Sequence, residues 1–521
     1  MNVPNVNMWI LVVFAVYFSA IIGLAIYFRK SSNMSDYYLA GRSLNTWVGA
    51  LSAQTSDMSG WLLMGLPGAV WAAGFGGAWI AVGLTIGTII NWLFVAKKLR
   101  RYTIVANGSI TLPEFLENRF RDKSHVLKTT AAVFFAIFFT LYAASGFVAG
   151  GTLLPRIFDL NYQTAVLILS AFVVIYTLIG GLKAISWTDT IQGMLMFFAV
   201  LFLPIIIVSM MGGWSEITAA VDQPGFFNLF YSGGNRISAI AIISGLAWGL
   251  GYFGMPHILI KLIAIKKEKY VGRSALIAII WVVIALAAAV MVGLVGRAFM
   301  PDLANPETVF NLSVSRIFLY GGSPIWMVLL GALFLCGMFA AIKSTADSQL
   351  LVGSSAVGDI YKQINKKASD KHMVWFSRGT VLAVALIALW IALNAYDPVI
   401  GGPDRTRGVM ALVAMAWSGF GAAFGPIVLT SLYWKRTNRV GAIAGILAGG
   451  LTVLIWQYAP IMGGETFFGG VTLLAHTGLL SIVPGFALSL IAIIIGSLVT
   501  KKPTAEMLAD FETAKKPLIE D

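Results

Sequence analysis

Apolar residues in this chain come in blocks that are separated by short polar segments. Each block is about twenty residues long, the length at which a helix crosses the ~30 Å hydrocarbon core of a bilayer. About thirteen such blocks are found by this criterion, near residues 8–28, 45–73, 75–96, 129–158, 162–179, 188–212, 237–265, 275–299, 325–354, 374–395, 408–433, 440–458 and 479–499. The pattern therefore predicts an all-α integral membrane protein with about thirteen transmembrane helices.

The second block is interrupted by a polar stretch from Ser52 to Gly60 that contains Asp57. An ionisable side chain at the centre of a membrane helix costs about 2.5–3.5 kcal/mol on insertion scales, so it usually faces a cavity, an ion or an opposite charge. Broken helices of this kind bind cations in secondary transporters, so the stretch predicts a solute pathway. A second acid, Asp189, opens the sixth block, where it could bind a cation or cap the helix at the interface.

Another interrupted block lies at 237–265, where several glycines precede Pro256. The two interrupted blocks are five spans apart, as expected for two inverted repeats that build one binding site between them. We therefore expect residues 1–44 to form an N-terminal helix and the first cytoplasmic loop, and 45–212 the first repeat. Residues 213–433 would form the second repeat, and 434–521 the C-terminal helices and a cytoplasmic tail.

Charged residues predict the membrane topology. The chain is 58% hydrophobic and 11% charged, with a formal net charge of +13. Lysine and arginine gather after the first, third, seventh, ninth, eleventh and last blocks, and the intervening loops hold few. The positive-inside rule then places the N-terminus outside and the C-terminus in the cytoplasm of a bacterial inner or plasma membrane. The basic charge thus reflects loop topology and not nucleic-acid binding.

Oxygen-bearing residues share one face of the ninth block. Ala341, Ser344 and Thr345 have i, i+3, i+4 spacing. Two hydroxyls and a free carbonyl suit a hard cation such as Na⁺, and Asp347 and Ser348 extend the polar patch. Serine and threonine also hydrogen-bond between membrane helices, and this alternative stays open.

Six motifs are specific enough to compare with known families. They read Ser56-Asp57-Met58-Ser59-Gly60-Trp61, Met64-Gly65-Leu66-Pro67-Gly68-Ala69, Phe138-Phe139-Thr140-Leu141-Tyr142-Ala143-Ala144-Ser145-Gly146, Ser186-Trp187-Thr188-Asp189-Thr190, Trp248-Gly249-Leu250-Gly251-Tyr252-Phe253-Gly254 and Trp417-Ser418-Gly419-Phe420-Gly421-Ala422-Ala423-Phe424-Gly425-Pro426. With these motifs the chain resembles the sodium/solute symporter family, and within it the bacterial sodium/proline symporters. The similarity runs through nearly the whole chain and implies a LeuT-like fold of two inverted five-helix repeats.

The resemblance also implies site residues. The main sodium site would use the carbonyls of Thr55, Met58 and Ala341 with the hydroxyls of Ser344 and Thr345, and Asp57 would lie beside it. A second cation position, present in some members, would map to Asp189, Ser344, Asp347 and Ser348. Proline-site positions map to Ser59, Trp61, Gly65, Tyr142, Trp248, Tyr252 and Pro256. Aromatic walls would pack the pyrrolidine ring, although aromatic residues also pack helix against helix in other membrane proteins.

Two positions depart from the family pattern. Met255 stands where the proline symporters have glutamine, which removes a polar group from the substrate region. Lys343 stands where the family has an apolar residue. We expect an i,i+4 pair with Asp347 that puts the ammonium in the second cation position as a tethered charge. The alternatives are an ammonium that reaches the main site, with proton exchange in place of sodium coupling, and a lysine that only snorkels toward the cytoplasm.

These features favour a cation-coupled symporter, with sodium as the favoured ion, that imports proline or a similar small zwitterion by alternating access. The alternatives are proton coupling, or another solute such as a monocarboxylate or sugar acid. An enzyme is not expected, because the sequence carries no nucleophile–base or metal motif. The expected partners are the solute, the coupling cation and membrane lipid, without nucleic acid or an obligate protein partner.

Overall fold

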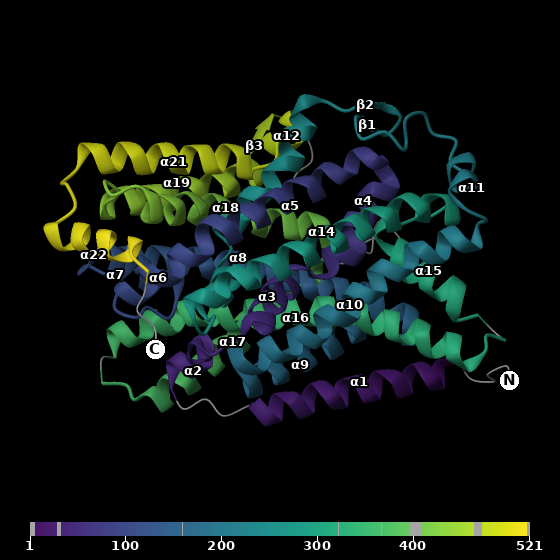
Figure 1. Cartoon of the computed structure of the whole chain (residues 1–521), viewed down its shortest axis with the longest axis horizontal. Helices are drawn as coiled ribbons and strands as arrows, with labels where there is room; N and C mark the ends of the chain where they lie inside the picture. Colours follow the sequence, from purple (N-terminus) through teal and green to yellow (C-terminus); the bar gives the residue numbers. More distant parts are fainter. Residues whose placement is uncertain are drawn as a thin grey trace.

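Long helices dominate the computed structural model, which describes residues 6–28, 33–158, 160–320, 322–365, 367–395, 409–462 and 471–517. They run side by side along the longest axis of the molecule (Figure 1). Up to the middle of the chain the helices are α1 (Val6–Phe28), α2 (Met34–Leu39), η1 (Ala40–Arg42), α3 (Thr46–Asp57), η2 (Trp61–Gly65), α4 (Leu66–Ala73), η3 (Phe75–Ala78), α5 (Trp79–Ile90), η4 (Asn91–Ala96), α6 (Lys97–Val105), α7 (Leu112–Arg119), α8 (Val126–Phe158), α9 (Tyr162–Gly180), α10 (Leu182–Met210) and α11 (Trp214–Ala219).

The second half continues in the same way. Its helices are α12 (Ala239–Ala247), η5 (Trp248–Phe253), α13 (Pro256–Ile263), α14 (Glu268–Phe299), η6 (Pro306–Thr308), α15 (Val309–Phe318), α16 (Ile325–Ile364), α17 (Asp370–Asn394), α18 (Val409–Tyr433), α19 (Arg439–Tyr458), α20 (Leu473–Thr477), α21 (Ile482–Val499) and α22 (Ala505–Lys515). Two short antiparallel hairpins pair β1 (Tyr231–Ser232) with β2 (Asn235–Arg236), and β3 (Pro460–Met462) with β4 (Val471–Thr472).

The number of membrane spans differs from the predicted thirteen. In the part of the chain that the structure describes, 11 helices are long and apolar enough to cross a membrane, and 12 spans result if Ala239–Phe253 and Pro256–Ile263 count as one bent span. The block predicted at 45–73 is not among them, because α3 has only 12 residues and ends at a break. The all-α, multi-pass architecture is confirmed, whereas the count of thirteen is not.

Side-chain caps fix where several of these helices begin. The Asn45 side chain accepts a 2.9 Å hydrogen bond from the Val48 amide and starts α3. The Ser238 hydroxyl caps α12 in the same way, through a 3.2 Å bond from the Ala241 amide. Such caps satisfy amides that the first helical turn leaves unpaired.

Burial separates central from peripheral helices. In the most apolar window of each helix, 89% of α18 is buried but only 22% of α1, so α1 lies at the edge of the bundle. Within α3 every residue from Val48 to Asp57 is buried, and within α16 every residue from Phe334 to Ala356. Polar side chains in these two stretches therefore face protein and not lipid.

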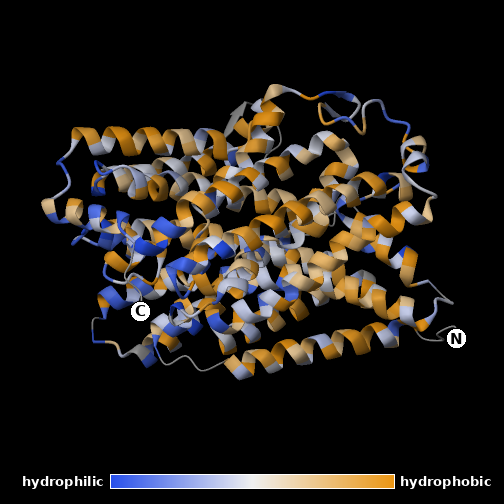
Figure 2. Cartoon of the chain, viewed as in Figure 1, coloured by the Kyte–Doolittle hydropathy of each residue, from blue (hydrophilic) through white to orange (hydrophobic). Residues whose placement is uncertain are grey.

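Hydrophilic residues gather at one end of the bundle, around α6, α7 and α22, while the long helices are mostly apolar along their lengths (Figure 2). The helix α1 begins at the opposite end of the molecule from α22 (Figure 1). Such a distribution places the hydrocarbon layer around the middle of the bundle.

Candidate functional site

Both interrupted blocks of the sequence are broken helices in the structure. The first break follows α3, where Met58 leaves helical geometry with φ −79° and ψ 74°. The second break follows η5, where Met255 is extended with φ −80° and ψ 104°, and Pro256 starts α13 after a 45° bend. Backbone groups at such breaks are free to bind a ligand, as in the discontinuous helices of transporters.

Asp57 lies where the two breaks meet. Its carboxylate accepts a 2.5 Å hydrogen bond from the Tyr252 hydroxyl on η5. Its main-chain carbonyl accepts a 2.9 Å bond from the indole of Trp61. All three residues are almost completely buried. One acidic residue thus holds the break of α3, the start of η2 and the second broken helix together.

An aromatic wall lines the second break. The Trp248 and Trp417 rings stack with centroids 6.3 Å apart, and Tyr252 packs edge-on against Trp417 at 5.1 Å. The Trp417 indole also donates a 2.8 Å bond to the Trp248 carbonyl. Gly251 permits this approach, since a Cβ there would overlap the Trp417 ring. The sequence analysis did not place Trp417 in the site. The closely spaced glycines of η5 were the available signal, because they leave room for a large side chain from another helix.

Tyr142 brings α8 to the same region. Its buried side chain lies near Ser59 and Trp61, yet the Tyr142 hydroxyl has no hydrogen-bond partner in the part of the chain that the structure describes. A buried unpaired hydroxyl is costly, so such a group often marks a position where a ligand or water binds.

The remaining predicted substrate residues lie around this centre. Ser59 follows the break of α3, and its hydroxyl accepts a 3.3 Å bond from the Trp61 amide. Gly65 packs against Met410 at the start of α18. Met255 is buried at the second break, and Pro256 lines a narrow cavity with Tyr38 and Ile110. The structure therefore groups Ser59, Trp61, Tyr142 and Tyr252 around Asp57, and places Gly65 and Pro256 toward neighbouring elements.

The predicted sodium ligands lie between α3 and α16. The Ser344 hydroxyl donates hydrogen bonds of 3.2 Å each to the Thr55 carbonyl and the Ala341 carbonyl. These three oxygens lie close enough together to bind one cation that prefers oxygen ligands. The hydroxyl of Thr345 is buried without a hydrogen-bond partner among the described residues. Met58 lies at the C-terminal end of α3, one turn beyond Thr55.

Close packing of α10 against α3 supports this group. A Cβ on Gly193 of α10 would overlap the Thr55 hydroxyl oxygen. The Thr55 side chain is therefore held against the backbone of α10, which fixes the residue whose carbonyl faces Ser344.

Asp189 is buried well inside α10 and not at a helix entry. The helix begins at Leu182, two turns before Asp189, so the predicted block start at 188 was late and the capping interpretation is wrong. The Asp189 carboxylate accepts a 2.9 Å bond from the Ser52 hydroxyl and pairs with the Lys261 ammonium. Lys261 also donates a 3.0 Å bond to the Ser348 hydroxyl. Sequence reasoning missed Lys261, although its position six residues after the break at Met255 was the available signal.

Lys343 and Asp347 form a second buried ion pair. The Lys343 ammonium lies 2.6 Å from an Asp347 oxygen, as the i,i+4 spacing predicted, and neither side chain is exposed. The snorkelling alternative is wrong, because the ammonium lies 3.4 Å from the Thr188 hydroxyl and 3.3 Å from the centre of the Tyr176 ring. Thr188 and Tyr176 also hydrogen-bond to each other at 2.5 Å.

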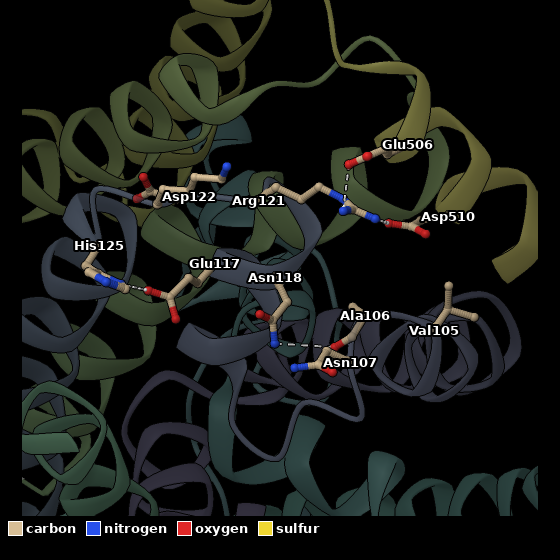
Figure 3. Close-up of a pocket in the computed structure, with 11 residues that line it drawn as sticks. Val105, Ala106, Asn107, Glu117, Asn118, Arg121, Asp122, His125, Glu506 and Asp510 are labelled. Carbon is tan, nitrogen blue, oxygen red and sulfur yellow. Dashed lines mark hydrogen bonds and ion pairs between the residues drawn. The ribbon is translucent and has the colours of Figure 1, made fainter. Parts of the chain in front are cut away.

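A separate cavity of about 620 Å³ opens at the hydrophilic end of the bundle, between the α6–α7 region and α22. Figure 3 shows Arg121 reaching from the end of α7 to Glu506 and Asp510 of α22, both at 2.8 Å. Nearby, burial raises the pKa of the Asp122 carboxyl, but hydrogen bonds from Ser124, Leu127 and Arg439 outweigh it, so the pKa lies below its usual value. These contacts anchor the C-terminal helix and lie apart from the broken helices.

The chain is similar to known transporters over nearly its whole length. It is 41% identical over 507 residues to the sodium/proline symporter of Escherichia coli strain K12. This alignment covers 97% of this chain and 96% of that protein. It is also 41% identical over 492 residues to the high-affinity proline transporter of Bacillus subtilis strain 168, covering 93% of this chain and 96% of that protein.

Solved structures share the fold. A substrate-bound, outward-open Na⁺-coupled sialic acid symporter superposes with a TM-score of 0.72 at 18% identity, covering 96% of this chain and 99% of that one. A nucleobase-cation-symport-1 family transporter in a closed conformation superposes with a TM-score of 0.51 at 13% identity. The fold is thus the LeuT-like fold that the sequence predicted. The model of the sodium:solute symporter family matches residues 37–449, and the chain therefore belongs to the sodium:solute symporter family.

Proposed function

We propose that the protein is a sodium-coupled symporter that imports proline or a similar small zwitterion by alternating access. The observation that carries this proposal is the position of Asp57, which joins the two broken helices through Tyr252 and lies next to the oxygen cluster of Thr55, Ala341 and Ser344. The relatives named sodium/proline symporter support the same solute and ion.

The solute site would lie between the two breaks. Trp248, Tyr252 and Trp417 offer apolar ring faces of the size of a pyrrolidine ring. Amides at the N-terminus of α13 carry partial positive charge and suit the carboxylate of the solute. The unpaired hydroxyl of Tyr142 supplies a further donor.

The sodium site would lie on the other side of the first break, with Thr55, Met58, Ala341, Ser344 and Thr345 as ligands. Sodium there would bind the end of α3 to α16, because the carbonyls come from both helices. The same end of α3 carries Asp57 and, beyond the break, Ser59 and Trp61. Ion binding would therefore order the strip of chain that faces the solute, which is the coupling that symport requires.

Topology is part of the same proposal. The N-terminus would lie outside and the C-terminus in the cytoplasm of a bacterial plasma membrane, since α1 begins opposite to the hydrophilic end that carries α22. The two repeats would comprise residues 45–212 and 213–433, each beginning with one of the broken helices. Membrane lipid would surround the bundle, and the proposal requires no protein partner.

Met255 is the observation that favours a second class of solute. An apolar side chain is buried at this break, where the family resemblance implies glutamine, so a monocarboxylate or sugar acid is the alternative substrate. The test is counterflow in proteoliposomes that are loaded with unlabelled proline. Labelled proline is added outside, and the sodium concentration is the same on both sides of the membrane. We expect accumulation of label that excess external proline abolishes and lactate or a sugar acid does not. Absence of proline counterflow, with counterflow of another solute, would contradict proline as the substrate.

A further inference from the structure

Four charged side chains are buried together beside the candidate sodium site. They are Asp189 on α10, Lys261 on α13, and Lys343 and Asp347 on α16, and none is exposed to solvent. Two ammonium groups and two carboxylates sum to zero formal charge. Because an unpaired charge in the protein interior is costly, this balance is itself a structural requirement.

Lys261 has a complete set of partners. Its ammonium contacts the Asp189 carboxylate, the Ser348 hydroxyl at 3.0 Å and the Ser52 carbonyl at 3.3 Å. These are three acceptors for three N–H donors. Lys261 and Asp189 therefore form a neutral, self-contained unit that ties α3, α10, α13 and α16 together.

Lys343 lies instead in surroundings that a free cation could occupy. The ammonium has a carboxylate oxygen of Asp347 at 2.6 Å, the Thr188 hydroxyl at 3.4 Å and the face of the Tyr176 ring at 3.3 Å. Carboxylate and hydroxyl oxygens bind hard cations, and a ring face attracts them. Among the described residues, one Asp189 oxygen has no hydrogen-bond partner, and Asp347 has no partner beyond its ion pair with Lys343, so oxygen ligands are still available in this cluster.

Removing the Lys343 charge would change the cluster from neutral to a net charge of −1. Without a proton, neutrality would return if a monovalent cation bound where the ammonium lies now, against Asp347 and Thr188. The ammonium of Lys343 thus fills the place of an ion but cannot dissociate, because it is attached to α16.

We propose that Lys343 is the residue that sets the coupling stoichiometry of this transporter. Its tethered ammonium neutralises Asp347 and keeps a second sodium out, so a single sodium, bound at Thr55, Ala341 and Ser344, accompanies each solute molecule. This proposal rests on the proposed function, because it presumes sodium at that site.

The first test counts sodium on the purified protein by equilibrium binding of ²²Na⁺, without any solute. We expect one sodium per wild-type chain, two per Lys343→Met chain, and one per chain in the double variant Lys343→Met/Asp347→Asn, in which neutrality returns without an added ion. Two sodium ions on the wild type, or one on a folded Lys343→Met protein, would overturn the proposal. No sodium on either protein would overturn the sodium assignment of the proposed function as well, so the two failures are distinguishable.

A second test decides the proposal on wild-type protein, whether or not a variant folds. In proteoliposomes with no membrane potential, an inward tenfold sodium gradient balances about a tenfold outward proline gradient if one sodium is coupled, and about a hundredfold gradient if two are coupled. We expect net proline flux to reverse near the tenfold ratio. Reversal near the hundredfold ratio would overturn the proposal, while Lys343→Met should move the reversal point toward it.

Discussion

The hydroxyl of Tyr252 donates a 2.5 Å hydrogen bond to the carboxylate of Asp57, across 195 residues of chain. Each residue lies at the break of a different interrupted helix, and the second Asp57 oxygen has no hydrogen-bond partner in the described part of the chain. The two broken helices therefore meet through one buried carboxylate, next to the backbone carbonyls that form the candidate sodium site.

Tyr252→Phe tests this hydrogen bond between the two broken helices. A hydrogen bond to a charged group is worth about 1.5–3 kcal/mol, so we expect the sodium concentration for half-maximal proline uptake to rise about ten- to a hundredfold. Asp57→Asn should weaken sodium activation further, with the protein still inserted and folded. The matched control is Tyr102→Phe, which removes a buried hydroxyl that, unlike the Tyr252 hydroxyl, lacks a hydrogen-bond partner among the described residues. Unchanged sodium activation in Asp57→Asn would leave Asp57 with a purely structural role.

Tyr142→Phe tests the proposed solute site without damaging the fold. The Tyr142 hydroxyl has no hydrogen-bond partner among the described residues, so its loss should not lower thermal stability and should weaken proline binding about tenfold. Trp248→Ala removes part of the aromatic wall and should weaken binding about ten- to a hundredfold. The measurement is the proline concentration that half-saturates counterflow. Wild-type values in both variants would show that the solute binds elsewhere.

Gly193→Ala tests the packing behind the candidate sodium site. The added methyl group would overlap the Thr55 hydroxyl oxygen, so Thr55 must move, and its carbonyl with it. We expect sodium activation to weaken at least tenfold while uptake at saturating sodium is partly kept. Gly379→Ala on α17 is the control, because a Cβ there meets no atom within 4 Å. Equal effects of the two substitutions would remove the link between Gly193 and the ion.

Asp122→Asn tests the hydrogen-bonded contacts of Asp122 at the hydrophilic end of the bundle. Since the folded-state pKa of Asp122 lies below its ordinary value of 3.8, the ionised group stabilises the fold at neutral pH, and this contribution is lost as pH falls through the lowered pKa. We expect a loss of about 1–3 kcal/mol at pH 7, measured by thermal unfolding in detergent, that shrinks below about pH 4. The exposed Asp222→Asn is the control. A pH-independent loss would assign the effect to packing instead of charge.

Hydropathy and motif spacing predicted the fold well where each helix is regular. The two helix breaks were also predictable, because Asp57 and the glycines before Pro256 are incompatible with an uninterrupted apolar helix. The span count was less secure, since α3 is short and polar, and hydropathy alone does not distinguish a broken span from a regular one.

The ion-pair network was only half predictable. Lys343 and Asp347 share one helix, so their pairing follows from i,i+4 geometry. The pair of Lys261 and Asp189 joins residues 72 positions apart on different helices, and no local rule brings them together. Trp417 was missed for the same reason, because its contacts with Trp248 and Tyr252 depend on how α18 packs against η5.

Sodium coupling can be measured by imposing the sodium and proton gradients one at a time. Purified protein in proteoliposomes is given an inward sodium gradient or an inward proton gradient separately, and labelled proline accumulation is followed. The sodium gradient should drive accumulation at equal pH on both sides, and the proton gradient should drive none when sodium is absent. Accumulation driven by the proton gradient in sodium-free medium, with no response to the sodium gradient, would contradict sodium coupling.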